Sequence, residues 1–181
     1  MGFSPSSRSE SSGRVLSTKE GKLRMPSKSI IDPGSIDLGI TIFGQEEIRR
    51  RNSQRHEMEM LNRIVHYDPG NSTIAGVHEV RDDAFWIRGH FPDRPILPGV
   101  LMIETAGQLC SFYFGESLES DDILGFAACE DVRFRGVVNP GSELLMIGEV
   151  TVLRSKLAKF SAQGYVGGER VFEGTVVGMK L

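Results

Sequence analysis

Two side chains that could exchange protons with a substrate flank a proline-rich segment near the middle of the chain. His90 can take up a proton near neutral pH, and Glu104 follows it fourteen positions later in a strongly apolar run. A base and an acid that reach one pocket from different elements can remove a proton from one carbon and protonate a leaving group on the next. Taken separately, each has a structural alternative, because an isolated histidine is more often exposed or bonded locally and a glutamate in an apolar helix is more often salt-bridged.

The apolar run predicts a buried helix over residues 99–114. Proline before a helix start and glycine just past its end are the expected asymmetry, and Pro98 and Gly115 occupy those positions. The run is apolar nearly all round, which is typical of a buried helix. At about 24 Å it is too short to span a membrane comfortably. Glu104 and Gln108 share one face, so Glu104 belongs either to a satisfied internal polar network or to a pocket where it acts as an acid.

The start of this helix is a candidate binding group in its own right. Unpaired N–H groups and the positive end of the helix dipole gather at Gly99, which has no side chain to block a ligand. Such a start can hold a carbonyl oxygen as it gains negative charge, an effect often worth about 3–4 kcal/mol per donor. Pro92, Pro95 and Pro98 stiffen the loop that connects His90 to this helix.

Composition narrows the class of protein. The 181 residues are 39% hydrophobic and 25% charged, as in a soluble globular protein, and the net charge of −3 argues against a nucleic-acid binder. The histidines are scattered and there is no C-x-x-C, so no metal is expected. No glycine-rich phosphate loop precedes a helix, so no nucleotide is expected. The first thirty residues lack the apolar core of a secretory signal, and we expect a cytoplasmic protein without a membrane partner.

The rest of the chain predicts one α+β domain behind a tail. Residues 1–30 are rich in Ser, Lys, Arg and Gly and predict disorder, whereas residues 31–181 predict a single domain. Residues 45–51 predict a short helix. Apolar or alternating runs between turn residues predict antiparallel strands at 64–67, 73–80, 84–88, 123–129, 131–138, 143–153, 158–166 and 170–179. A sheet of these strands wrapped around the central helix would explain why that helix has no polar face.

Several other side chains have structural interpretations. Cys110 and Cys129 lie in apolar stretches of sequence, so we expect both to be reduced residues of the core, which fits a reducing compartment. We expect Trp86 to anchor the core or an interface. Arg133 and Arg135 share one face of an alternating strand, where internal salt bridges are preferred over contact with an acidic partner or a phosphate.

Residues 89–108 read GHFPDRPILPGVLMIETAGQ. This segment resembles the signature of bacterial β-hydroxyacyl-acyl-carrier-protein dehydratases of the FabZ type, G-H-F-P-x-x-P-x-x-P-G-V-L-x-x-E-x-x-x-Q. The related dehydratase-isomerases carry Asp where this chain has Glu104, which favours the simple dehydratase. The matching positions are Gly89, His90, Phe91, Pro92, Pro95, Pro98, Gly99, Val100, Leu101, Glu104 and Gln108.

Two further segments are similar to this family, and the similarity extends over about residues 45–180. Residues 132–142 resemble A-R-F-x-x-P-V-x-P-G-D: Arg133, Phe134, Val138, Pro140 and Gly141 match, and Ser142 departs from the pattern. Residues 53–64 read SQRHEMEMLNRI where the family has P-H-R-x-P-F-L-L-V-D-R-V. The prolines and the aspartate of that pattern are replaced, a departure that bears on the pocket mouth and on the preferred chain length.

The resemblance implies a hot-dog fold, in which an antiparallel sheet wraps one long central apolar helix. It implies dehydration of a (3R)-3-hydroxyacyl thioester to the trans-2-enoyl product in fatty-acid biosynthesis. His90 would be the base and Glu104 the acid, Gly99 N–H would polarise the thioester carbonyl, and Gln108 would orient Glu104 or a water. The other expected substrate-contacting positions are Val100 and Phe91.

The resemblance also implies partners. The substrate would be carried on the phosphopantetheine of acyl carrier protein or on coenzyme A, and no cofactor is expected. Family members work as dimers, usually assembled into trimers of dimers, in which the histidine comes from one subunit and the glutamate from its partner. Two alternatives stay open: an acyl thioesterase with the same fold, and a non-catalytic acyl-thioester-binding protein.

Overall fold

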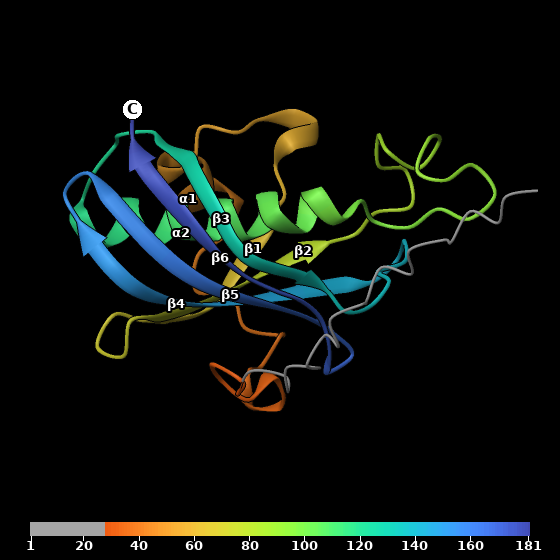
Figure 1. Cartoon of the computed structure of the whole chain (residues 1–181), viewed down its shortest axis with the longest axis horizontal. Coiled ribbons are helices and arrows are strands. Elements are labelled where there is room, and N and C mark those ends of the chain that lie inside the picture. Colours follow the sequence, from red (N-terminus) through yellow and green to blue (C-terminus); the bar gives the residue numbers. More distant parts are fainter. Residues whose placement is uncertain (1–27) are drawn as a thin grey trace, which may run out of the picture.

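The computed structural model describes residues 28–181, and in this part of the chain six antiparallel strands form one sheet with a long helix across one face (Figure 1). The helix is α2 (Gly99–Leu118). The sheet order is β1-β2-β4-β5-β6-β3, which makes β1 and β3 the edge strands. The strands are β1 (Arg63–Asp68), β2 (Thr73–Glu79), β3 (Leu124–Phe134), β4 (Glu143–Arg154), β5 (Leu157–Val166) and β6 (Glu169–Lys180).

The sheet is built largely from hairpins, as the sequence predicted. The β5–β6 turn has Gly167 and Gly168 at φ +56° and +84°, a backbone conformation that glycine adopts at little cost. The predicted strands in residues 64–80 and 143–179 are confirmed to within a few residues. The two runs predicted at 123–129 and 131–138 instead form the single strand β3, whose pairing with β6 shifts register between Glu130 and Arg133.

The core lies between α2 and the sheet. The helix contacts β2, β3, β4, β5 and β6, which explains why it is apolar nearly all round. Phe112 and Phe114 from α2 belong to the same buried cluster as Phe160 from β5 and Phe172 from β6. Each such side chain contributes roughly 1.5–3 kcal/mol when fully buried, so this cluster fixes how α2 sits on the sheet. The fold class predicted from the sequence is confirmed.

The opposite face of the sheet is covered by residues 30–38, whose place the sequence left undefined. Ile30, Ile31, Ile36 and Leu38 pack over a second apolar cluster that includes Val65, Ala75, Val77, Leu145 and Ile147. The side chain of Gln163 anchors the segment, because it accepts from Ile30 N and donates to Lys28 O, each over 2.9 Å. The predicted disordered tail otherwise lies outside the described residues.

Three short helical elements precede the sheet or lie beside it: η1 (Pro33–Ser35), α1 (Gln45–Arg51) and η2 (His56–Met58). The predicted helix over 45–51 is confirmed. Its first turn begins with Gly44 N donating to Glu47 Oε2 over 3.0 Å. At its end, Arg51 reaches Glu116 of α2 over 3.0 Å, so α1 is tied to the far end of the central helix.

Two local predictions are wrong. Helix α2 does not end before Gly115 but continues to Leu118, because Glu119 at φ +49° caps it and Gly115 packs inside the helix against Arg51 and Ser120. Residues 84–88 form consecutive turns and not a strand: Ile87 N donates to Ala84 O, and both Gly89 N and His90 N donate to Trp86 O. Trp86 anchors these turns to the core, and an apolar run does not distinguish such an anchored turn from a strand.

Candidate active site

His90 lies in the loop between β2 and α2, which projects beyond the start of α2 (Figure 1). Its Nδ1 is 3.0 Å from the carbonyl oxygen of Ile96. A carbonyl oxygen can only accept, so Nδ1 carries the hydrogen, and the neutral ring keeps a free lone pair on Nε2. The ring of Phe91 stacks on the imidazole with centroids 4.2 Å apart, across a cis peptide bond. His90 is therefore held in the tautomer that a general base needs.

The loop around His90 is held at both ends. Trp86 is buried in the core, which confirms it as a core anchor, and its carbonyl accepts from His90 N over 2.8 Å. Ile96 N returns a hydrogen bond to His90 O over 3.1 Å, and Leu97 N donates to Val138 O over 2.8 Å. These bonds, together with three prolines, fix the path of the chain from His90 to the helix.

Helix α2 begins at Gly99, as predicted, with no side-chain cap from Pro98. The first turn of a helix has N–H groups without intrahelical acceptors, so the amides of Gly99 and Val100 are available for a ligand. A Cβ at Gly99 would lie 2.9 Å from the ring of Phe134, so glycine lets β3 approach the helix start closely. Val100 is 67% exposed in the single chain.

Glu104 lies in the second turn of α2 and is hydrogen-bonded rather than salt-bridged. Its Oε1 accepts from Gln108 Nε2 over 2.8 Å and from Gln54 Nε2 over 3.2 Å. The predicted contact between Gln108 and Glu104 is therefore present. The contribution of Gln54 was not predicted, and the only signal for it is its place in the segment that resembles P-H-R-x-P-F.

A groove of about 370 Å³ runs between α2 and the edge strand β3. Among the described residues that line it, Glu104 is the one carboxyl group, and the others are apolar apart from the thiol of Cys129. The prediction that Cys129 is a core residue is wrong: the side chain is exposed on β3, whereas Cys110 is buried as expected. Burial raises the pKa of the Cys110 thiol to about 12. The groove lining consists of Val100, Ile103, Glu104, Phe126, Ala127, Ala128 and Cys129.

Within the described chain, His90 and Glu104 do not complete one site. Glu104 lines the groove, but His90 does not. No hydrogen bond joins the two side chains in residues 28–181, since His90 is bonded to Ile96 and Glu104 to Gln54 and Gln108. The side chains of His90 and Glu104 are each oriented by their own neighbours, and a single described chain does not bring them into contact.

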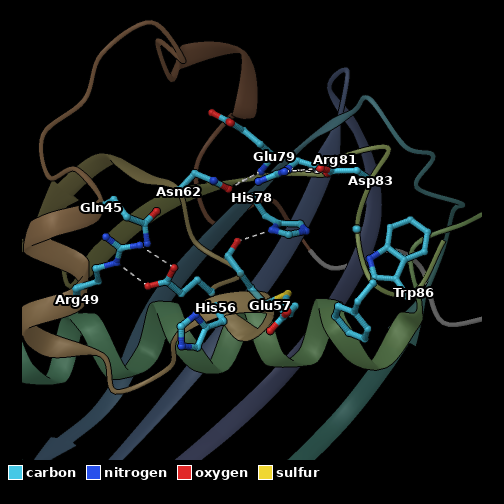
Figure 2. Close-up of a pocket in the computed structure, with 14 residues that line it drawn as sticks. Gln45, Arg49, His56, Glu57, Asn62, His78, Glu79, Arg81, Asp83 and Trp86 are labelled. Atoms are coloured by element: carbon cyan, nitrogen blue, oxygen red, sulfur yellow. Dashed lines mark hydrogen bonds and ion pairs between the residues drawn. The ribbon is translucent and has the colours of Figure 1, made fainter. Parts of the chain in front are cut away.

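A second cavity, of about 600 Å³, lies between α1, η2, the end of β2 and residues 81–86 (Figure 2). Its charged lining is largely paired internally: Arg49 binds Glu59 over 2.7 Å, and Arg81 binds Asp83. His78 points into the centre of this region and its Nδ1 donates to Met60 O (Figure 2). Burial lowers the pKa of His78. None of the predicted site residues lines this cavity.

Arg133 and Arg135 have the structural role that the sequence favoured. Both guanidinium groups contact Glu173 on β6. In the same described range, 28–181, no cluster of three or more His, Cys, Asp or Glu side chains is arranged to hold a metal ion. None of the helices there has the combined length and apolar character of a membrane span.

Comparison with solved structures identifies the architecture. The chain superposes on the dehydratase heterocomplex ApeI:P from Xenorhabdus doucetiae with a TM-score of 0.62 at 17% identity, covering 74% of this chain and 90% of that one. It also superposes on zebra fish thioesterase superfamily member 2 with a TM-score of 0.55 at 9% identity, covering 75% and 94%. At these identities the likeness shows the hot-dog fold alone, because dehydratases and thioesterases share it.

Sequence comparison separates these classes. The model of the FabA-like domain matches residues 52–175. A 3-hydroxyacyl-[acyl-carrier-protein] dehydratase FabZ from Clostridioides difficile is 33% identical over 133 residues, 73% of this chain and 93% of the relative. The FabZ of a Wolbachia from Brugia malayi is 32% identical over 124 residues, 66% of this chain and 84% of the relative. The chain therefore belongs to the FabA-like family, and within it to the dehydratases of the FabZ type.

Proposed function

We propose that this protein dehydrates (3R)-3-hydroxyacyl thioesters carried by acyl carrier protein to trans-2-enoyl thioesters, in fatty-acid biosynthesis. One observation carries the proposal: the span that matches the FabA-like domain, residues 52–175, contains His90, Gly99 and Glu104. The FabZ relatives, which are named for this reaction, cover most of the chain. Hydrolysis of the thioester has no comparable support, since the thioesterase neighbours share only the fold.

The chemistry follows from the groups in place. His90 Nε2 removes the proton from C2, and the electrons of that C–H bond move toward the thioester carbonyl, whose oxygen binds the N–H groups at the start of α2. The C2–C3 double bond then forms as the C3–O bond breaks. Glu104 gives its proton to the departing hydroxyl, which leaves as water. No oxidation change occurs, and the proton that His90 holds is returned to Glu104 or to solvent before the next turnover.

The groove between α2 and β3 is the proposed seat of the acyl chain. Its lining is apolar apart from Glu104 and the Cys129 thiol, so burial of a hydrocarbon chain in the groove is favourable. In this position Glu104 would lie beside the carbon that loses its hydroxyl. Val100 and Phe91 are proposed as further substrate contacts, from the wall of the groove and from the face of His90 respectively.

A second copy of the chain is proposed to complete the site. Among residues 28–181, strand β3 pairs with β6 on one side only, and an exposed strand edge is a template for pairing with another chain. Apolar side chains cluster along this edge, including Phe126 at 48% and Phe134 at 51% exposure. A homodimer formed along β3 would set His90 of the partner subunit against Glu104. Assembly of three such dimers into a hexamer is the further step that family members suggest.

The test is hydration of crotonoyl thioesters, on acyl carrier protein and on coenzyme A, followed by loss of enoyl absorbance. His90→Ala and Glu104→Gln are each expected to lose about 10²–10⁴-fold in rate, because each removes a positioned acid or base. His66→Ala and Glu57→Gln are matched controls outside the groove and are expected to keep their activity. Release of free thiol without hydration would identify a thioesterase instead. A verified wild-type dimer that is inactive on both carriers would refute the proposal.

A further inference from the structure

Two side-chain amides donate to the same oxygen of Glu104. Gln108 Nε2 and Gln54 Nε2 approach Oε1 to 2.8 Å and 3.2 Å. They come from different elements, since Gln108 lies one turn further along α2 and Gln54 lies between α1 and η2. Among residues 28–181, no hydrogen bond reaches Oε2 of Glu104. The two oxygens of this carboxyl group therefore have different surroundings.

The amide of Gln108 has a fixed orientation. The side chain is only 2% exposed, its Oε1 accepts from Met60 N over 2.9 Å, and its Nε2 also donates to Met58 O over 2.7 Å. Rotating the amide by half a turn would set oxygen against oxygen and N–H against N–H. The donor that Gln108 presents to Glu104 is thus set by the backbone of η2 and the residues that follow it.

The loop that carries Gln54 is also braced. The guanidinium group of Arg55 donates to the carbonyl oxygens of Asn52 and Gln54, over 2.7 Å and 2.6 Å. It reaches Arg49 O as well, over 3.0 Å. Asn52 is buried and its Nδ2 donates to Gln108 O over 3.0 Å. Gln54 is therefore presented to Glu104 by a short turn that is itself bonded to α2.

We propose that Gln54 is a positioning residue for Glu104, an inference that rests on the proposed function. A proton on Oε1 would point at the hydrogens of two N–H donors, so the neutral carboxyl group carries its proton on Oε2. After the proton leaves, both amides stabilise the negative charge on Oε1. Gln54 and Gln108 together select which oxygen delivers the proton and hold it in the groove, and Gln54 acts only through Glu104.

Two substitutions of Gln54 test the hydrogen bond that it donates to Glu104. Gln54→Met keeps the length of the side chain and removes the donor, whereas Gln54→His offers an imidazole N–H at the position where the FabZ pattern P-H-R has histidine. Gln45→Met is the matched control, because the Gln45 amide nitrogen is buried in α1 and has no hydrogen-bond partner among the described residues. Each change is made in the full-length protein, alone and together with Glu104→Gln.

The experiment measures kcat and KM for hydration of crotonoyl thioester, with the thermal midpoint of each variant. Gln54→Met is expected to lower kcat about fivefold to tenfold with KM unchanged, the effect of one hydrogen bond made to the reacting acid. Gln54→His is expected to restore most of the rate, and Gln45→Met to stay within about twofold of wild type. In the Glu104→Gln background, Gln54→Met is expected to have no further effect, because no proton remains to be positioned.

Two results would overturn the inference while leaving the proposed function intact. One is a wild-type rate in Gln54→Met. The other is an equal loss from Gln54→Met with and without Glu104→Gln, together with a lowered thermal midpoint, which identifies a merely structural role. If the wild-type protein itself does not hydrate the substrate, the proposed function fails and the inference fails with it.

Discussion

Replacing Gln108 by leucine tests whether its buried amide holds η2 against α2. The side chain makes three hydrogen bonds, one accepted from Met60 N and two donated to Met58 O and Glu104. Leucine has a similar volume and no polar atoms, so the change removes the bonds without opening a large cavity. The polar groups left without a partner at Met58 and Met60 determine the loss of stability.

The magnitude follows from how exposed those groups are. Met60 is buried, and a buried N–H without a partner costs about 1–3 kcal/mol. Met58 is exposed, so water can replace the bond to its carbonyl at a cost of about 1 kcal/mol or less. Burial of the leucine returns about 1 kcal/mol of apolar transfer free energy. We expect a net loss of about 2 kcal/mol, roughly a thirtyfold change in the unfolding equilibrium.

Urea unfolding measures this loss. Trp86 is the one tryptophan of the chain and is buried in the core, so its fluorescence reports unfolding of the region that contains the site. Wild type and Gln108→Leu are compared at equal protein concentration, because association of the chain would add to the apparent stability. The Gln54→Met variant, which loses one partly exposed bond, is the control. A loss below about 0.5 kcal/mol for Gln108→Leu would show that the amide network does not stabilise the fold.

Two further outcomes are expected. Gly148→Ala in β4 should cost about 3 kcal/mol of unfolding free energy, because its Cβ would lie 1.9 Å from the fully buried ring of Phe160, and a thermal midpoint within about a degree of wild type would contradict this. His78 is 8% exposed and its pKa is lowered by burial, so the unfolded chain binds more protons below pH about 6.5 and stability falls as the pH is lowered from 7 toward 5. His78→Asn, whose amide can still donate to Met60 O, should show a smaller fall over that range in urea unfolding, and an unchanged pH dependence would refute the assignment.

The sequence predicted the elements whose patterns are local. Alternation and turn residues located β1, β2 and the strands from β4 to β6, and the proline–glycine step located the start of α2. The end of α2 was missed because glycine usually stops a helix, whereas Gly115 is needed here to pack against Arg51. The false strand at 84–88 has the same kind of cause: Trp86 is buried in the core, but the backbone of the segment forms its hydrogen bonds within turns.

The covering of the outer sheet face was beyond sequence reasoning. Ile30, Ile31, Ile36 and Leu38 read as short apolar runs without periodicity, and only the arrangement of β1, β2 and β4 shows what they cover. Cys129 was misplaced for a related reason. Its neighbours are apolar because they line an open groove on an edge strand, and apolar surroundings alone do not distinguish a groove from a core.

For the site, residue types and spacing located the groups but not their relation. His90, Gly99 and Glu104 lie at the loop, the helix start and the groove, where the motif indicated. Within one described chain, His90 and Glu104 share no hydrogen bond, because the loop that carries His90 projects beyond the start of α2. The number of residues between the two side chains does not predict the direction of that loop. Gln54 was missed because it stands where the family pattern P-H-R has histidine. A mismatch with the pattern does not predict which side chain the new residue contacts.

Two glycines explain how the groove forms between a helix and a strand. Gly99 and Gly107 are eight residues apart on α2, a rise of about 12 Å. Each is covered by a phenylalanine of β3, since a Cβ would lie 2.9 Å from Phe134 and 2.4 Å from Phe126. Gly99 and Gly107 therefore let β3 come close to the helix on either side of Glu104, which lines the groove. The same short stretch of α2 that carries Glu104 therefore also sets how closely the strand approaches the helix.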